Sequence, residues 1–220
     1  MTEIEAIRAR HAVRNYTAKP LSPEIIDELS EEIEQCNRQG QLHIQLVTEN
    51  EDAFKTFIPL FGRFKNVKNY IALAAKKQGD FYVKCGYCGA RLMVKAQQAG
   101  LNSCWVTNTY NAKKCPVTLA PDEELVDVIA IGYGTTDGTQ HKSKSMERLC
   151  KPCSDKWFTD GMNAAVLAPT GLNRQNFFIE ANGNTVSIRT KDNHPMSQIN
   201  TGIVKYHFEI GAGRENFNWE

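Results

Sequence analysis

Apolar positions along the chain fall into helical stripes and short continuous runs separated by polar turns, which predicts an α+β protein. The segment "LSPEIIDELSEEIEQC" carries one such stripe, with Ser22 as a candidate N-cap and Pro23 at the first helical position. Residues 69–76, "NYIALAAK", form an unbroken apolar run that favours a buried strand. Further helices are expected over residues 2–9, 80–100, 156–167 and 197–210, and further strands over residues 42–48, 103–107, 124–134, 175–181 and 184–190.

Two polar connectors stand out in this pattern. The pair Asn182-Gly183 is typical of a type I′ turn and predicts a hairpin between the last two strands. The connector "APTGLNRQN" joins a helix to a strand and crowds Thr170, Asn173 and Gln175 behind Pro169. Turn and capping chemistry accounts for such residues in general, and a bound ligand is the alternative explanation.

Composition narrows the range of partners. The chain has 220 residues, with 26 Lys and Arg against 25 Asp and Glu, and a net charge of +1. This balance gives no reason to expect a nucleic acid or a membrane surface as partner. The N-terminus is charged from its third residue and shows no apolar signal core, so the cytoplasm is the expected location.

The cysteines allow several readings. There are seven, an odd number that argues against a disulfide scaffold. Four of them form two C-x-x-C pairs, Cys85/Cys88 and Cys150/Cys153, which together make a four-thiolate zinc site conceivable. The pairs lie much farther apart than the roughly 15–20 residues of a compact zinc ribbon, and Cys85/Cys88 falls inside a predicted helix. We rank inert thiols first, zinc second and a redox pair third.

Basic residues occur in two alternating clusters. In an extended segment, alternate side chains point the same way, so the arginines of "RHAVR" are able to converge on a phosphate. A solvated helix end or ordinary surface remains the alternative for both clusters. The cluster residues are Arg10, His11, Ala12 and Arg14 in the first, and Lys142 and Lys144 in the second.

Four segments together resemble the FMN-dependent nitroreductase family, most closely a divergent branch of small single-domain members. They are "AIRARHAVRNYTAKPLSPEIIDEL", "AGLNSCWVTNTYN", "VIAIGYGTTDGTQHKSKS" and "APTGLNRQNFFI". The resemblance implies a central mixed or antiparallel sheet flanked by helices, within a single domain over residues 1–220. It also implies FMN as cofactor, with NAD(P)H as co-substrate.

The resemblance implies a site in which the flavin carries the redox chemistry and no side chain is catalytic. Ala12 replaces the family's Ser in the phosphate-binding segment. Arg63 or Lys65 are candidates for a positive charge near the flavin's pyrimidine side. The implied cofactor-binding residues are Arg10, His11, Ala12, Arg14, Thr107, Asn108, Thr109, Tyr110, Lys142, Lys144, Pro169, Thr170, Asn173 and Gln175.

The order of the segments differs from that of common family members. Their "APSxxNxQPW" loop follows the N-terminal helix, whereas here the similar loop lies at residues 168–178. We therefore expect residues 1–150 to be the main FMN-binding part and residues 151–220 to be an appended half-repeat, a fused pseudo-twofold arrangement. The alternative is a coincidence of common helix–loop–strand units. The duplication predicts a monomer-competent chain with one FMN, although a dimer is possible.

The resulting functional hypothesis is an NAD(P)H-dependent oxidoreductase that reduces small nitroaromatic, quinone or similar electron-poor substrates. Two alternatives stay open at this point. One is an FMN-binding protein without turnover, and the other is a zinc- or thiol-based C-x-x-C module.

Overall fold

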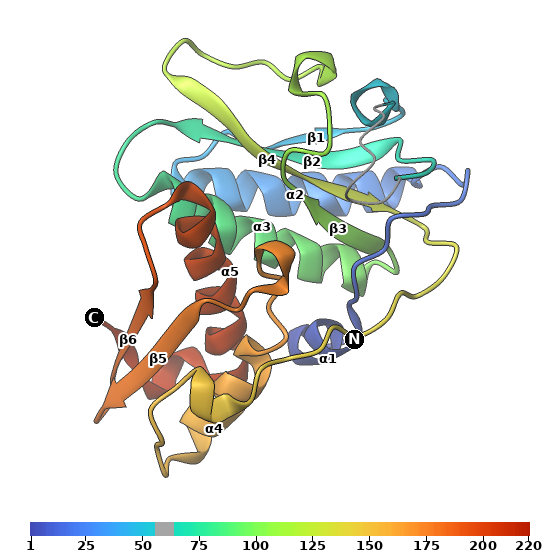
Figure 1. Ribbon diagram of the computed structural model, residues 1–220. Coiled ribbons are helices and arrows are strands. Elements are labelled where there is room, and N and C mark those ends of the chain that lie inside the picture. Colours follow the sequence, from blue (N-terminus) through green and yellow to red (C-terminus); the bar gives the residue numbers. More distant parts are fainter. Residues whose placement is uncertain (56–63) are drawn as a thin grey trace. The chain divides into compact units, whose positions relative to one another are not determined.

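The computed structural model describes residues 1–55 and 64–220, and the chain divides into two compact units (Figure 1). The sheet unit consists of Arg10–Phe81 and Leu92–Gln140, and the C-terminal unit consists of Met1–Ala9, Tyr82–Arg91 and His141–Glu220. Helix α3, Phe81–Gln98, contributes residues to both units. Each unit is described by itself below.

The sheet unit is built on a four-stranded antiparallel sheet with the order β1-β2-β4-β3. Its central strands lack polar alternation because both of their faces are covered, and every residue of β2 except Lys76 is buried. The strands are β1 (Gln45–Val47), β2 (Asn69–Lys76), β3 (Asn102–Val106) and β4 (Glu123–Gly132).

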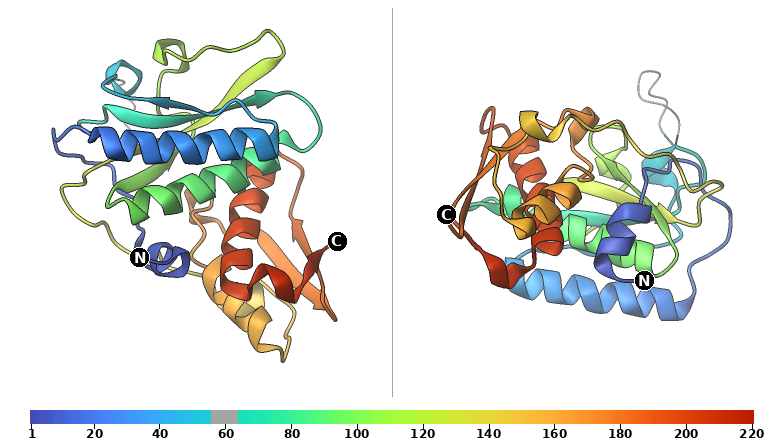
Figure 2. Two further views of the ribbon diagram at one scale, coloured as in Figure 1. Left: turned by 180° about the vertical axis from the view of Figure 1, so that it is seen from behind. Right: turned by 90° about the horizontal axis from the view of Figure 1, so that it is seen from below.

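Helix α2, Pro23–Gly40, and the second half of α3 lie on the same face of this sheet (Figures 1 and 2). The Ser22 hydroxyl caps α2 by accepting a hydrogen bond from the Ile25 amide, as the sequence predicts. Leu29, Ile33 and Cys36 form the buried stripe of α2. The amphipathic pattern therefore places this helix correctly.

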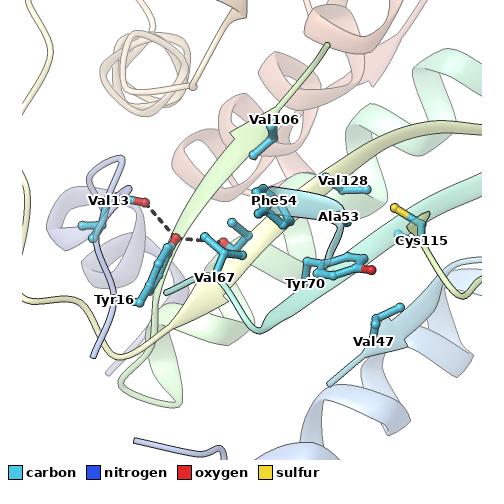
Figure 3. Close-up of a cluster of buried hydrophobic side chains, with 12 residues drawn as sticks. Val13, Tyr16, Val47, Ala53, Phe54, Val67, Tyr70, Val106, Cys115 and Val128 are labelled. Atoms are coloured by element: carbon cyan, nitrogen blue, oxygen red, sulfur yellow. Dashed lines mark hydrogen bonds between the residues drawn. The ribbon is translucent and has the colours of Figure 1, made fainter. Parts of the chain in front are cut away.

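The second face of the sheet carries a buried apolar cluster, shown in Figure 3. Tyr70 of β2 and Val128 of β4 point into it, whereas their neighbours Ile71 and Ile129 point to the opposite face. The Tyr16 hydroxyl donates to the carbonyl oxygen of Val13 at 2.7 Å and is 3.2 Å from that of Ala130. This tyrosine ties the segment after α1 to strand β4.

The C-terminal unit combines α1, α4, α5 and the first part of α3 with a small sheet of order β5-β6-β7. Strands β5 and β6 form an antiparallel hairpin, and β7 adds in parallel to β6. Helix α5 starts with Pro195 behind His194, whose ring nitrogen accepts from the Met196 amide. The elements are α1 (Glu3–Ala9), α4 (Lys156–Ala165), α5 (Pro195–Ala212), β5 (Phe177–Asn182), β6 (Thr185–Thr190) and β7 (Asn218–Trp219).

Short 3₁₀ helices complete the described chain. They are η1 (Asp52–Phe54), η2 (Ala112–Lys114), η3 (Met146–Arg148), η4 (Gly171–Asn173) and η5 (Arg214–Asn216). Within the described ranges, no helix combines the length and apolar character needed to cross a bilayer.

The structure confirms the α+β class and every predicted helix and strand, and it corrects one turn. Asn182 pairs with Thr185, so the two residues of the hairpin turn are Gly183 and Asn184. Gly183 alone has a positive φ, 57°, which fits a type II′ turn with glycine first rather than the predicted type I′ turn. The half-repeat over residues 151–220 stays a prediction.

Candidate functional site

The segment from Arg10 to Tyr16 follows an extended path through the sheet unit. The Val13 amide donates to the carbonyl oxygen of Ser103 in β3, and the Tyr16 amide donates to that of Lys65. These bonds hold the segment beside the sheet without helical turns. Burial along the segment does not alternate strictly, because Val13 and Tyr16 both enter the apolar cluster, and Arg10 is buried whereas Arg14 is exposed.

Arg10 is the unusual residue of this segment. Its side chain is only 4% exposed, and its Nε and Nη1 atoms are buried without a hydrogen-bond partner among residues 1–55 and 64–220. Burial lowers the pKa of the Arg10 guanidinium to about 10. A buried cation without a counter-charge is destabilising, so this position is suited to an anion.

Arg14 and Arg10 act on the same neighbour. Burial raises the pKa of the Cys104 thiol in β3, and the charges of Arg14 and Arg10 oppose that rise. The Arg10 guanidinium is buried, whereas Arg14 is exposed. Both arginines therefore act electrostatically on Cys104, and their convergence on one phosphate stays a prediction.

The loop after β4 packs against the same segment. Gly138 has a φ of 75°, and a Cβ there would lie 2.9 Å from the Cβ of His11 and 3.1 Å from the carbonyl oxygen of Ala12. Ala12 forms a parallel β-bridge with Ser103, whose hydroxyl is buried without a partner in the described part of the chain. Ala12 therefore contributes main-chain contacts only, and Ser103 lies beside it.

The predicted ring loop begins where β3 ends. Thr107 Oγ1 donates to Asp127 Oδ2 at 3.0 Å, and Asn108 adopts a left-handed conformation with a φ of 63°. Thr109 is half-buried, and Tyr110 is half-buried against Phe54, with a distance of 6.4 Å between ring centroids. Side-chain contacts of Thr107 and Tyr110 thus flank an exposed Asn108.

Asp127 is a site residue that the sequence analysis missed. It is 2% exposed in β4 and accepts hydrogen bonds from Trp105 Nε1 at 2.7 Å and from Thr107. The available signal was a single carboxylate inside the apolar run "LVDVIAIG". A charged residue there needs buried donors, which the sequence does not identify.

The remaining predicted residues meet in the C-terminal unit. The Lys144 amide donates to Gln175 Oε1 at 2.6 Å, and Lys144 Nζ donates to the Gln175 carbonyl oxygen at 3.1 Å. Asn173 Nδ2 donates to the Lys142 carbonyl oxygen at 2.7 Å. The second basic cluster and the polar connector therefore form one structural group.

Much of the polar crowding in this connector shapes the connector itself. The Gln175 amide donates to Thr170 Oγ1 at 3.0 Å, and Gln175 Nε2 donates to the Val166 carbonyl oxygen at 2.8 Å. Leu172, Asn173 and Gln175 all have positive φ, between 44° and 52°, and such conformations need support from their surroundings. Turn chemistry accounts for these bonds, and ligand contacts by half-buried Pro169, buried Thr170 and exposed Asn173 stay predictions.

Two further sequence hypotheses concern a positive charge at Arg63 or Lys65 and a zinc site at the cysteine pairs. Arg63 lies outside the described residues, and the Lys65 amide pairs with the Arg14 carbonyl oxygen. Six cysteines are buried, and Cys153 is half-buried. In the ranges that the structure describes, no group of three or more His, Cys, Asp or Glu side chains is placed to hold a metal ion. The four-thiolate zinc hypothesis therefore gains no support from Cys85, Cys88, Cys150 and Cys153.

The fold is that of an α+β protein with a four-stranded antiparallel sheet, beside which an extended segment carries the buried Arg10. Residues 3–212 match a family described as "Putative TM nitroreductase", and the chain belongs to this nitroreductase family. The family resemblance predicted from the sequence is thereby confirmed. A search of curated proteins finds no match.

Solved structures share the fold at low sequence identity. A nitroreductase of Thermotoga maritima, described as putative, has a TM-score of 0.66 at 21% identity and covers 98% of this chain and 85% of its own. One from Desulfovibrio desulfuricans, described as a complex with FMN, has a TM-score of 0.57 at 15% identity, over 70% of this chain and 99% of its own. A Parabacteroides distasonis protein described as "Putative NADH dehydrogenase/NAD(P)H nitroreductase" has a TM-score of 0.54 at 19% identity and covers 67% of this chain and 95% of its own. Identities this low establish the fold alone.

Proposed function

We propose that this protein is an FMN-dependent oxidoreductase that takes electrons from NAD(P)H and reduces small electron-poor acceptors such as nitroaromatics or quinones. Membership of the nitroreductase family supports an oxidoreductase. The Desulfovibrio desulfuricans relative is described as bound to FMN, and its whole length matches within this chain, which supports FMN as the cofactor.

The main support for the proposal is the environment of the buried Arg10 side chain. A buried guanidinium with Nε and Nη1 lacking partners in the described ranges is destabilising in the protein alone. A phosphate group supplies both the negative charge and oxygen acceptors that suit the guanidinium fork. The phosphate of FMN therefore fits the chemistry of this position, with exposed Arg14 as a second positive charge.

Each part of the chain has a proposed task. Arg10 and Arg14 bind the phosphate, and the buried Ser103 hydroxyl provides a donor where Ala12 has none. The loop from Thr107 to Tyr110 orients the ring. FMN itself supplies hydride acceptance and electron transfer, so no nucleophile or general acid is required from the protein. Cofactor contacts from Thr170, Asn173 and Lys142 stay expectations from the sequence alone.

A spectroscopic experiment tests the proposal in three steps. The purified chain is first titrated with FMN, and quenching of flavin fluorescence gives the affinity and stoichiometry. NADH or NADPH is then added without oxygen, and the visible flavin absorbance should bleach. A nitroaromatic or quinone should restore it. Absence of FMN binding at saturating flavin contradicts the proposal as a whole.

The same titration separates the main alternative function. Replacement of the family's Ser by Ala12 favours weaker or altered phosphate contact, which suits a flavin-binding protein without turnover. That protein would bind FMN stoichiometrically, but NADH and NADPH would leave its absorbance unchanged.

A further inference from the structure

The end of strand β3 is held by a single buried carboxylate oxygen. Asp127 Oδ2 accepts from the Trp105 indole at 2.7 Å and from the Thr107 hydroxyl at 3.0 Å. Trp105 lies within β3, and Thr107 is the first residue after it. One oxygen atom of β4 therefore connects the end of the neighbouring strand with the start of the ring loop.

Backbone pairing extends to the start of this loop but not into it. Val106 is the last residue of β3 and pairs with Val128. Beyond it, the loop reaches Asn108, which is exposed and left-handed. The Asp127 carboxylate thus fixes Thr107 through a side-chain bond where the regular β-ladder has ended.

The surroundings of Asp127 favour its neutral form. Burial raises the pKa of the Asp127 carboxyl to about 6, although the bonds from Trp105 and Thr107 oppose the rise. On the other neighbouring strand, β2, the residue in register is Leu73, which has no charge. Tyr110 from the ring loop interacts electrostatically with Asp127, and burial raises the pKa of this phenol, so it is neutral throughout the range in which Asp127 titrates.

We propose that Asp127 is a positioning residue for the flavin ring loop, in which the ionised carboxylate fixes Trp105 and Thr107 and protonation loosens them. Hydrogen bonds to an ionised acceptor are roughly twice as strong as those to a neutral one. Protonation weakens both bonds together because they share Oδ2. The loop then orders less well, and flavin affinity falls. This inference rests on the proposed function for its flavin ligand.

The first experiment follows FMN affinity and tryptophan fluorescence between about pH 4.5 and pH 8. The wild-type chain is compared with Asp127→Asn and with Asp122→Asn, an exposed carboxylate that pairs with Lys76. Trp105 fluorescence should change with a midpoint near the pKa of Asp127, and the Kd for FMN should rise several-fold below it. Asp122→Asn should behave like the wild type, whereas Asp127→Asn should show neither change.

A second variant keeps the inference testable if Asp127→Asn does not fold. Thr107→Val leaves the carboxylate in place and removes one donor to it. Since that bond favours the ionised form, its loss should move the fluorescence midpoint to higher pH. An unchanged midpoint would overturn the inference, as would a wild-type chain whose fluorescence and FMN affinity do not vary with pH.

These experiments distinguish a failure of the proposed function from a failure of the inference about Asp127. If the wild-type chain fails to bind FMN at neutral pH, the proposed function fails, and with it the role in flavin positioning. If FMN binds at neutral pH but its affinity has the same pH dependence in Asp127→Asn, the function stands and the role of Asp127 is wrong.

Discussion

Gly86 of α3 and Gly202 of α5 lie at a crossing where each helix meets the backbone of the other. A Cβ on Gly86 would overlap the carbonyl group of Ile199, and one on Gly202 would overlap the carbonyl oxygen of Val83 and lie 2.5 Å from the Tyr87 amide nitrogen. The two glycines are therefore required by close helix packing within the C-terminal unit.

This crossing predicts that Gly202→Ala is destabilising. Overpacking of this kind costs about 1–3 kcal/mol, because the helices must separate to admit the methyl group. Urea unfolding measures the loss. Thr201→Ala, on the neighbouring half-buried position of α5, serves as the control and should stay within about 0.5 kcal/mol of the wild type. An equal loss of unfolding free energy in the two variants would contradict the conclusion that close helix packing requires Gly202.

Arg10→Met should have opposite effects on stability and on binding. Removing a buried charge that has no partner in the described ranges should leave the FMN-free chain equally or more stable. Losing the charge-assisted bonds to phosphate should weaken FMN binding about 10- to 100-fold, from about 1.5–3 kcal/mol. Thermal melting and flavin titration measure the two quantities.

A surface arginine provides the control for that experiment. Arg38 pairs with Glu34 on α2, with both side chains more than half exposed. Arg38→Met should change neither FMN affinity nor melting temperature appreciably. A loss of melting temperature in Arg10→Met without a loss of affinity would indicate that Arg10 has a purely structural role.

Gln175→Ala should disorder the connector that the sequence singles out. Gln175 is 1% exposed, and its side-chain amide satisfies the Lys144 amide and the Val166 carbonyl oxygen. The variant leaves the Lys144 amide without this acceptor, which costs about 1–3 kcal/mol, whereas the Val166 carbonyl oxygen keeps its hydrogen bond from the Ser143 hydroxyl. Amide hydrogen exchange should show faster exchange at Lys144. Asn173→Ala removes an exposed bond only and should have a smaller effect on stability.

Asp127 should make the free energy of unfolding depend on pH. Its folded-state pKa, about 6, is above the ordinary value of 3.8, so the folded chain holds more protons between these values. Its contribution is therefore favourable at low pH and is lost as the pH rises from about 4 to about 6, by about 3 kcal/mol. The difference in unfolding free energy between wild type and Asp127→Asn, measured by urea at both ends of this range, should change by that amount. A constant difference would contradict it.

Mass and flavin content in solution test the predicted half-repeat. If residues 151–220 are an appended half-repeat that completes the site within one chain, a chain of 24.7 kDa should bind one FMN as a monomer. Light scattering with simultaneous flavin absorbance measures both values. A flavin that binds only to dimers would rule this arrangement out.

The elements of the fold were predictable where local chemistry decides them. The apolar run at residues 69–76 coincides with β2, Asn69–Lys76, because a strand buried on both faces needs apolar side chains at every position. Ser22 and Pro23 marked the start of α2 because capping involves neighbouring residues only. The hairpin was also predicted, but its turn is displaced by one residue, since strand pairing and not the Asn-Gly pair decides the register.

The candidate site was predictable only in part. The sequence alone indicated the family, the elements, the two arginines proposed to bind a phosphate and the polar connector. The tertiary structure decided that Arg10 is buried, that Gln175 joins Lys144, and that Asp127 holds Trp105 and Thr107. Burial and hydrogen bonding between residues far apart in the chain depend on which segments pack together, and no local pattern of side chains contains that information.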